Sequence, residues 1–341
     1  MRVSVIVPVK NNAKLLSKLL KTLSSQTLKP YEVIVVDDGS VDGSPQVAKA
    51  YGAIVLCTGG GKGPNFARSL GVKNAKGDIV AFTDSDCTPS RDWIKSLVED
   101  FQRCPEASVV VGTTIAANPD AFLARFLDNS LLTPTPKYAK RLMLKNDFKP
   151  GIIVATCNMA VLRQVFEKVG LFDPAYKYYG SDDMDFVYRV LKNGFVVLCS
   201  PKPLVRHHHR ASLNNILKRY FQYGQGFAIF LKRYPKSVFS ISVGLAIVSL
   251  ITLLSLSVIT AFTNPSLSLA LFLLAFSPVL IYHLLRAIRK RSPEMLAYPF
   301  LDFMLALASC AGFLFMLSKM ALKVSLRATL GYSRGGTIIK D

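Results

Sequence analysis

The sequence predicts an α/β domain with a mostly parallel sheet and helices on both faces, followed by helices that cross a membrane. Residues 3–112 alternate short apolar runs with helix-period segments, which is the rhythm of β-α-β units. Residues 237–285 contain no Lys, Arg, Asp or Glu, and this charge-free stretch is long enough for two spans of roughly 20 residues each. The chain is therefore expected to consist of an α/β domain followed by a membrane domain.

The elements of the α/β part follow from its apolar pattern. Short β-branched runs predict strands at residues 3–9, 32–36, 53–56, 78–82 and 108–111. Apolar residues at helical spacing predict helices at residues 14–25, 44–51, 65–74 and 89–103. Beyond residue 115 the pattern is less regular, and we expect helices at 120–131, 159–169 and 181–193 and a strand at 195–199. Ligands of such sheets bind at the carboxyl ends of the strands.

An amphipathic segment separates the two parts. Residues 212–234 place apolar side chains at helical spacing, interrupted by Gly224 and Gly226, with four basic residues off that stripe. This pattern, just before a span, is typical of a helix that lies in the membrane interface. The alternative is an ordinary surface helix packed on the α/β domain. The expected units are thus a catalytic domain at 1–210, an interfacial linker at 211–236 and a membrane domain with a basic tail at 237–341.

Three apolar segments make up the membrane domain, at residues 238–262, 267–285 and 296–318. Asn264 and Pro265 predict a tight turn between the first two, and Arg286 begins a basic loop after the second. Basic residues before the first span and after the second place both of those loops inside. A third crossing would put the basic tail outside, so the alternatives are a broken charge rule or a re-entrant or interfacial last helix. The length of the segment favours three crossings.

The charge distribution favours a membrane over a nucleic acid as partner. The net charge is +20, of which residues 201–341 contribute +14. This surplus on the membrane part suits anionic lipid headgroups, and no nucleic-acid-binding motif is present. Six scattered cysteines without a CxxC pattern indicate free thiols in a reducing compartment. The first apolar run is too short for a signal peptide, so we expect an integral membrane protein whose catalytic domain is cytoplasmic.

Two acidic motifs follow predicted strands. In Asp84-Ser85-Asp86, an extended backbone would turn both carboxylates to one side, where a divalent cation and substrate phosphates offset their repulsion. A solvated turn is the alternative for this short motif. The second motif, Asp37-Asp38-Gly39-Ser40, suits hydrogen bonds to a nucleobase or ribose, or equally a helix cap and turn.

Two further motifs lie later in the chain. Asp182, Asp183 and Asp185 open a predicted helix, where they suit a general base or compensate the helix dipole, and Asp185 can pair with Arg189 one turn on. Residues 207–210, three histidines and an arginine, suit a metal ligand or phosphate contact. Taken alone, they favour a solvated basic cluster.

The order and spacing of these motifs resemble glycosyltransferase family 2, which has the GT-A fold. The matching segments are residues 3–12, 26–42, 63–71, 77–86, 157–163, 170–173, 182–189 and 205–207. The resemblance covers about residues 1–210. It implies an inverting, metal-dependent transfer of a sugar from a UDP-, GDP- or dTDP-sugar, with Mg²⁺ or Mn²⁺ as cofactor.

The resemblance also implies roles for individual residues. The catalytic base would be Asp183, and the metal would be held by Asp86 and His207. The nucleotide-sugar would contact Pro8, Val9, Asp38, Arg68, Asp84 and Ser85. The acceptor side would include Asn158, Asp182, Asp185 and Arg189. Two departures are Lys10, where relatives often have an aromatic residue that stacks on the base, and Asp182, which replaces a glutamate.

The acceptor is expected to be a lipid or lipid-linked molecule, because the membrane helices adjoin the catalytic domain. A hydroxyl acceptor suits a base such as Asp183, whereas a polyprenyl or dolichyl phosphate acceptor needs none. A processive synthase is disfavoured, since Arg219 and its neighbours replace the QxxRW motif. An inactive scaffold is disfavoured too, because Asp86 and Asp183 are present. A homo-oligomer is compatible with the sequence.

Overall fold

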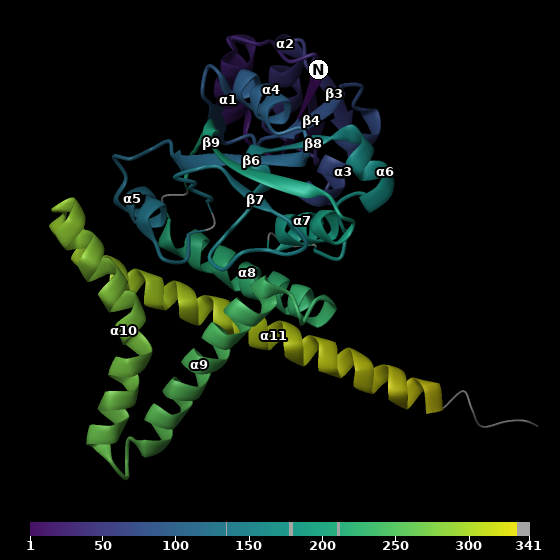
Figure 1. Cartoon of the computed structure of the whole chain (residues 1–341). Coiled ribbons are helices and arrows are strands. Elements are labelled where there is room, and N and C mark those ends of the chain that lie inside the picture. Colours follow the sequence, from purple (N-terminus) through teal and green to yellow (C-terminus); the bar gives the residue numbers. More distant parts are fainter. Residues whose placement is uncertain (134, 177–179, 210–211, 333–341) are drawn as a thin grey trace, which may run out of the picture.

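The α/β domain forms one end of the molecule and long helices project from the other (Figure 1). The computed structural model describes residues 1–133, 135–176, 180–209 and 212–332. The basic tail expected beyond residue 332 lies outside this part of the chain. The strands belong to one nine-stranded sheet, so the α/β class predicted from the sequence is confirmed.

The first half of the sheet is parallel. Its strands run in the order β3 (Ile54–Cys57), β2 (Glu32–Asp37), β1 (Val3–Val9) and β4 (Ile79–Phe82). The second half is mixed, and its strands are β8 (Met159–Leu162), β6 (Ala107–Ala116), β9 (Val196–His207), β5 (Cys87–Pro89) and β7 (Leu142–Leu144). In this half β6 and β9 are parallel, while β8, β5 and β7 pair antiparallel with their neighbours.

Helices cover both faces of the sheet, as predicted. One face packs against α1 (Ala13–Ser24), α2 (Ser44–Ala50) and α4 (Trp93–Arg103). The other packs against α3 (Pro64–Asn74), α6 (Arg163–Val169) and α7 (Asp182–Lys192). A short helix, α5 (Phe122–Asn129), lies off the sheet toward the membrane helices. The sheet is therefore a buried scaffold whose strand ends are free to carry a site.

Several boundaries differ from the predictions, and the strand expected at 108–111 continues to Ala116. The helix expected at 159–169 is a strand, β8, followed by α6, because a short apolar run does not distinguish a central strand from a buried helix turn. The helix expected at 89–103 begins only at Trp93, since residues 87–89 pair with β9. The strand expected at 195–199 continues to His207, with a register irregularity beside Gly112.

Three C-terminal helices are long and apolar enough to cross a membrane. They are α9 (Val238–Thr260), α10 (Pro265–Lys290) and α11 (Tyr298–Tyr332), and the qualifying part of α11 ends at Leu322. The turn between α9 and α10 forms as predicted, with the Asn264 side chain accepting a hydrogen bond from the backbone N–H of Leu267 at 3.0 Å. The predicted basic loop is wrong in part, because Arg286, Arg289 and Lys290 belong to the last turns of α10. Basic side chains there oppose the negative end of the helix dipole.

Helix α8 (Leu213–Arg233) is enclosed by protein on several sides. Phe230 is buried in the core of the α/β domain, while Ile216 and Tyr220 pack with residues of α5, α10 and α11. Phe227 packs with residues of α9 and α11. Much of the apolar stripe therefore packs on protein, and α8 joins the two parts of the chain.

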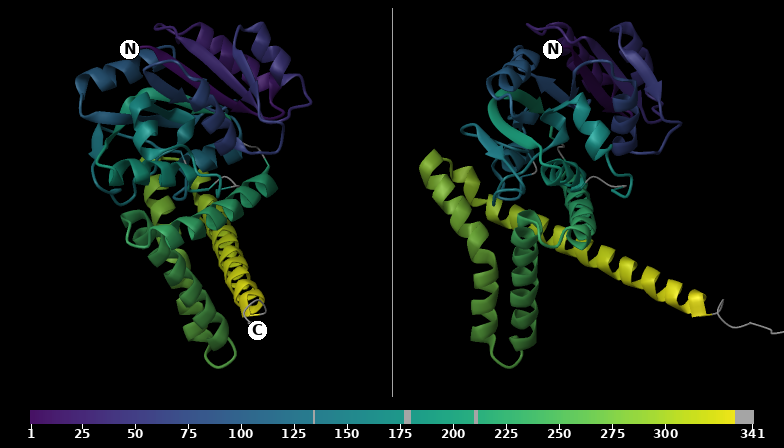
Figure 2. Two further views of the ribbon diagram at one scale, coloured as in Figure 1. Left: turned by 90° about the vertical axis from the view of Figure 1, so that its right-hand side faces the viewer. Right: turned by 45° about the vertical axis from the view of Figure 1, so that its right-hand side comes forward.

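Helix α11 crosses α8 and runs oblique to the α9–α10 hairpin (Figures 1 and 2). The crossing is close because glycines face it from both helices. A Cβ at Gly224 would lie 1.9 Å from the Ser309 carbonyl oxygen, and a Cβ at Gly312 would lie 1.9 Å from the Phe221 carbonyl oxygen. Real side-chain atoms do not approach so closely, so any larger residue would push the helices apart.

This crossing predicts that Gly312→Ala destabilises the protein, by about 1–3 kcal/mol, through overpacking between two backbones. The measurement is the thermal unfolding midpoint of the full chain in detergent. The matched control is Gly244→Ala on α9, where a Cβ meets nothing within 4 Å. The control should leave the midpoint unchanged or raise it, since alanine favours helix. Equal midpoints for the two variants would show that the crossing tolerates a larger separation.

Candidate active site

The motifs singled out in the sequence meet at the carboxyl ends of the central strands. Asp38 follows β2, Asp84 follows β4, and His207 ends β9. Helix α7 brings Asp182 and Asp183 to the same region, because both Asp84 and Asp182 contact Arg68 on α3. The sheet thus gathers residues from five parts of the sequence at one edge, as expected for an α/β fold.

Arg68 links the two acidic motifs. Its side chain is 2% exposed, and one of its terminal nitrogens lies 2.9 Å from Asp84 Oδ1. The other terminal nitrogen lies 3.4 Å from Asp182 Oδ2 and 3.2 Å from Asn65 Oδ1. A buried guanidinium needs such partners, because an uncompensated charge in the interior is strongly destabilising. The position of α7 relative to Asp84 is therefore fixed by a charged contact.

The two carboxylates at the start of α7 have raised pKa values. Burial raises the pKa of Asp182 above its ordinary value, and the nearby Arg68 charge opposes this rise. Burial, and then the charge of Asp182, raise the pKa of the half-buried Asp183 to about 8. A carboxylate with a raised pKa is a stronger base, which suits it to accept a proton near neutral pH.

A second group of ligand atoms surrounds Asp86. Oxygen, sulfur and nitrogen atoms of Asp86, Cys87 and His207 all lie within 4.8 Å of one another. His207 Nε2 is 3.4 Å from Asp86 Oδ1, and Cys87 and His207 face each other across β5 and β9. His207 Nδ1 is buried and has no hydrogen-bond partner among the described residues. Carboxylate and imidazole donors so close together fit a divalent cation such as Mn²⁺.

An extended backbone was predicted for the Asp84-Ser85-Asp86 motif, and this prediction is wrong. The backbone forms a turn closed by a hydrogen bond from the Cys87 N–H to the Asp84 carbonyl oxygen at 3.0 Å. The two carboxylates consequently have separate partners, Arg68 for Asp84 and His207 for Asp86. This division allows one acid to be held by the protein while the other remains available to a cation.

The histidines after β9 do not form a solvated cluster. His209 is 4% exposed, and its ring lies 5.0 Å from that of His207. Burial and the neighbouring His207 lower the pKa of His209 to about 3, so this ring is neutral at physiological pH. Arg210, the fourth residue of the motif, lies outside the described residues. The interpretation as a basic surface patch is therefore wrong for this segment.

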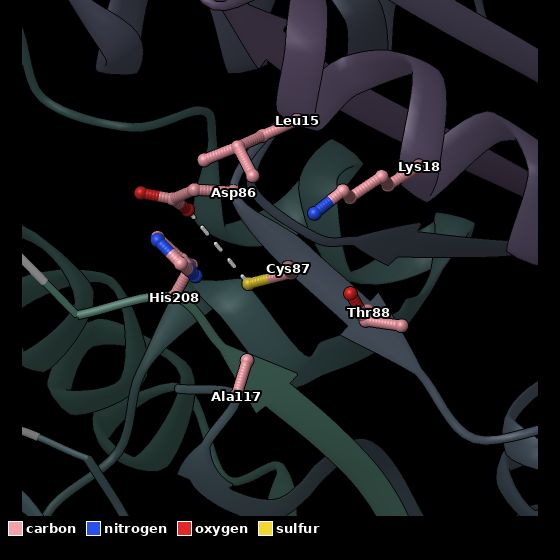
Figure 3. A pocket seen from close by; sticks show the side chains of 7 residues that line it. All are labelled: Leu15, Lys18, Asp86, Cys87, Thr88, Ala117 and His208. Atoms are coloured by element: carbon pink, nitrogen blue, oxygen red, sulfur yellow. Dashed lines mark hydrogen bonds between the residues drawn. The ribbon is translucent and has the colours of Figure 1, made fainter. Parts of the chain in front are cut away.

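A small cavity of about 90 Å³ opens beside Asp86 (Figure 3). Its lining residues are Leu15, Lys18, Asp86, Cys87, Thr88, Ala117 and His208. In this view the Lys18 ammonium approaches from α1, opposite the Asp86 carboxylate and the His208 ring. The cavity thus offers a cation, an acid and an imidazole to a polar ligand.

Asp38, expected to bind a nucleobase, is held by a glycine-rich loop. Its carboxylate accepts hydrogen bonds from the Thr58 hydroxyl and from the backbone N–H groups of Lys62 at 2.9 Å and Gly63 at 3.0 Å. Burial alone would raise the pKa of Asp38, but these hydrogen bonds and the Lys10 charge lower it below its ordinary value. The Asp38 carboxylate therefore holds the loop of residues 58–63, which precedes α3 and Arg68.

The remaining residues expected at the nucleotide lie at the same edge of the sheet. Pro8 and Val9 end β1, and the Val9 carbonyl oxygen accepts a hydrogen bond from the Asp38 N–H at 2.9 Å. The Ser85 hydroxyl accepts one from the Asn12 side chain at 2.9 Å. Pro8 is half-buried and Val9 is buried, so the backbone of β1 borders the site more than its side chains do.

Asp185 and Arg189 pair as predicted, at 2.9 Å, but the pair is structural. The fully buried Asp185 also accepts hydrogen bonds from the Tyr176 and Tyr234 hydroxyls, at 3.2 and 3.1 Å. Arg189 donates to the carbonyl oxygens of Val169 and Leu171. The pair fastens α7 to the preceding loop and to the end of α8, and neither side chain is free for an acceptor.

Asn158, also expected on the acceptor side, is fully buried and occupied by protein. Its amide nitrogen donates to the carbonyl oxygens of Thr113 at 2.8 Å and Pro203 at 3.0 Å. Its amide oxygen accepts from the Trp93 indole at 2.8 Å. Asn158 therefore joins β6, β9 and α4, and an acceptor contact would require breaking these bonds.

Several residues of the site were not predicted from the sequence. Cys87 directly follows the acidic motif, and its position in the chain could have indicated a fourth polar group there. Thr58 and Asn12 gave no such signal, because their partners Asp38 and Ser85 are 20 and 73 positions away in the sequence. Contacts of this kind are decided by the packing of loops at the strand ends.

Fold and site together define a class of protein. The sheet is mostly parallel, its strands β2 and β4 end in acidic motifs, and the acidic start of α7 lies beside them. This combination is that of a glycosyltransferase with the GT-A fold. Among solved structures, the mannosyltransferase PcManGT from Pyrobaculum calidifontis in complex with GDP-Man and Mn²⁺ superposes with a TM-score of 0.58 at 18% identity. The match covers 92% of this chain and 87% of that one, and it shows the shared fold.

The family follows from sequence comparison. Residues 4–170 match the model of glycosyl transferase family 2, and the chain is a member of that family. It is 28% identical to the glycosyltransferase AglE of Haloferax volcanii, over 66% of this chain and 72% of that protein. It is 25% identical, over 68% of this chain and 74% of the relative, to a protein of Methanococcus voltae. That relative is named a dolichyl N-acetyl-alpha-D-glucosaminyl phosphate 3-beta-D-2,3-diacetamido-2,3-dideoxy-beta-D-glucuronosyltransferase.

The raised pKa of Asp183 predicts the pH dependence of sugar transfer. With Asp183 as the general base, the reaction requires its deprotonated form, so kcat/KM should fall as the pH is lowered through about 8. Asp182→Asn removes the neighbouring negative charge, which lowers the pKa of Asp183 and should move this limb of the profile to lower pH. The measurement is kcat/KM against pH at saturating Mg²⁺. If kcat/KM of Asp182→Asn falls at the same pH as that of the unaltered protein, a group other than Asp183 controls the pH dependence.

Proposed function

We propose that this chain is an inverting, metal-dependent glycosyltransferase. It transfers a sugar from a nucleoside-diphosphate sugar to a hydroxyl group of a lipid-linked acceptor at the cytoplasmic face of a membrane. The observation that carries this proposal is the Arg68 bridge, which holds Asp84 of the metal-type motif and Asp182 of α7 on one guanidinium. The donor side and the base side of the reaction are thereby held at a fixed spacing.

The residues of the donor side divide into two groups. Pro8, Val9 and Asp38 border the place for the nucleobase, while Ser85 and Asp84 lie toward the ribose and diphosphate. Asp86 and His207 would hold Mg²⁺ or Mn²⁺, and the fit rests on their ligand atoms within 4.8 Å and the unpartnered His207 Nδ1. Such a cation, when bound, offsets the negative charge of the leaving diphosphate. Arg68 and Lys18 add positive charge on the protein's side.

Asp183 is the proposed base. It removes the proton of an acceptor hydroxyl while the oxygen attacks the anomeric carbon on the face opposite the leaving diphosphate, which inverts the configuration. Its pKa, raised to about 8, makes it a stronger base than an ordinary carboxylate. An ionised phosphate acceptor would need no base, so this raised pKa favours the hydroxyl acceptor over a polyprenyl phosphate.

Three observations support a lipid-linked acceptor. The site domain, residues 1–210, is joined through α8 to helices that are long and apolar enough to cross a membrane. The buried Asp185 bonds Tyr234 at the end of α8, so the base helix is anchored beside those helices. The name of the Methanococcus voltae relative describes an acceptor sugar carried on dolichyl phosphate, and such a sugar presents hydroxyl groups.

The donor is accessible to a direct screen. The thermal unfolding midpoint of the full chain is measured with UDP-, GDP- and dTDP-sugars, with and without Mn²⁺. A metal-dependent rise with one nucleotide identifies the base. No rise with any of them, at concentrations that saturate related enzymes, would contradict the proposed donor class.

We predict that Asp183→Asn lowers transfer about 10²- to 10⁴-fold, since the amide cannot accept the proton. Nucleotide binding, measured by thermal shift, should stay near that of the unaltered protein. Transfer is followed as release of nucleoside diphosphate in the presence of a total lipid extract. Asp120→Asn, at an exposed position, is the control and should transfer normally. Near-normal turnover by Asp183→Asn would remove Asp183 from this role.

We also predict that His207→Ala weakens Mn²⁺ binding about tenfold or more, because a ring nitrogen is lost from the ligand set. Burial raises the pKa of the Cys87 thiol well above its ordinary value, so this residue is protonated and a poor ligand. Cys87→Ala should therefore change Mn²⁺ binding by less than about threefold. Electron paramagnetic resonance of free Mn²⁺ measures metal binding by both variants. A larger loss of binding in Cys87→Ala than in His207→Ala would show that Cys87, and not His207, is the ligand.

A further inference from the structure

A group of basic side chains gathers where α5 meets the end of α10. Lys137, Arg286, Arg289 and Lys290, hereafter the cationic cluster, lie close together near Asn129 at the C-terminus of α5. Arg286 donates to Asn129 Oδ1 at 2.9 Å and Lys290 donates to the same atom at 2.7 Å. Lys137 and Arg289 lie close enough to repel the Lys290 ammonium. Figure 1 shows α5 beside the end of α10 that is nearer the α/β domain.

Among the described residues, one acid balances one of the four charges of the cationic cluster. Asp128 is the acid that faces the cluster, and its carboxylate already pairs with Lys137 at 2.8 Å. Asn129 is neutral, so its oxygen orients two cations without neutralising them. The buried Nε of Arg286 has no hydrogen-bond partner among the described residues. By contrast, Arg125 on the same short helix is fully paired with Glu294, at 2.6 Å.

The location of the cationic cluster indicates what could neutralise it. Arg286 is the first charged residue after the charge-free stretch 237–285, so the cluster lies at the level expected for lipid headgroups. It is also close to the active site. The Asp128 carboxylate accepts a hydrogen bond from the Ala116 N–H at 3.0 Å, and Ala116 pairs with His207 across β6 and β9.

We propose that the cationic cluster binds the phosphate or diphosphate group of a membrane lipid. Arginine and lysine donors gathered in one place suit phosphate oxygens, and the exposed Arg289 and Lys290 are accessible to a headgroup. The lipid is either the acceptor itself, whose sugar would then extend toward Asp183, or a bulk anionic phospholipid. The first source rests on the proposed function, and the second does not.

A purely structural role for these residues is the competing explanation. Cations at the C-terminus of α5 compensate its dipole, and their bonds to Asn129 hold α5 against α10. However, hydrogen bonds from Arg286 and Lys290 to one neutral amide oxygen do little to offset the repulsion among the four cations. The two explanations also differ in what Asn129 does, because a clamp needs its side chain and an anion site does not.

The test measures lipid binding to the full chain in detergent by native mass spectrometry. The probes are a polyprenyl diphosphate, phosphatidylglycerol and phosphatidylcholine. The triple variant Lys137→Gln, Arg286→Gln, Lys290→Gln should bind anionic lipid at least about tenfold more weakly than the unaltered protein. Loss for the polyprenyl diphosphate alone identifies the acceptor as the source. Equal loss for phosphatidylglycerol identifies a bulk phospholipid.

Two controls make the result decisive. The variant Lys218→Gln, Lys232→Gln, Lys236→Gln removes the same charge from exposed positions on and just after α8, and it should bind within about threefold of the unaltered protein. Asn129→Ala should retain anionic lipid binding. The proposal is overturned if the cluster variant binds normally, if the α8 variant loses as much, or if Asn129→Ala does.

Donor binding separates this proposal from the proposed function. The thermal shift with nucleotide-sugar and Mn²⁺ is recorded on the same samples, and no residue of the cluster belongs to the donor site. Retained donor shift with lost lipid binding supports the cationic cluster. Absence of a donor shift in the unaltered protein contradicts the transferase proposal and leaves the lipid result standing by itself.

Discussion

The buried Arg68 guanidinium is the contact on which the arrangement of the site depends. It is 2% exposed and pairs with both Asp84 and Asp182, so one buried cation serves two carboxylates. Removing Arg68 would leave both carboxylates without their shared cation, which is strongly destabilising for the buried Asp182. This constraint ties the turn after β4 to the start of α7. The pKa of Asp183 responds to the same group of charges, since Asp182 raises it and Arg68 lowers it.

The same helix that carries Asp183 is coupled to the membrane part. Asp185, two residues on, accepts hydrogen bonds from Tyr176 and Tyr234 and pairs with Arg189. Tyr234 directly follows α8, and α8 is locked to α11 by the glycine crossing. A chain of buried contacts therefore runs from α7, the helix that carries Asp183, to the apolar helices. Such a connection suits an enzyme whose acceptor arrives from a lipid layer, because the site keeps its position relative to that layer.

Local pattern was reliable where one signal dominated. Strands β1, β2 and β4 and the acidic residues that follow them were predicted because a buried apolar run ends abruptly in charge. The helix predicted at 159–169 was wrong for its first four residues, because a short apolar run suits a central strand equally well and only pairing with β4 and β6 decides. The extended form assumed for residues 84–86 failed for a similar reason. A turn there is selected by the partners Arg68 and His207, which lie 16 or more positions away.

The sequence by itself determined the class of the fold, the family resemblance, the two-part organisation and the acidic motifs of the site. These depend on hydrophobic periodicity, charge-free length and residue order, which are local properties of a chain. Tertiary structure alone decided that Asn158, Asp185 and Arg189 are held by protein, that much of the apolar stripe of α8 packs on protein, and that Arg286 and Lys290 meet at Asn129. Each of these depends on segments far apart in sequence, whose contacts no local pattern specifies.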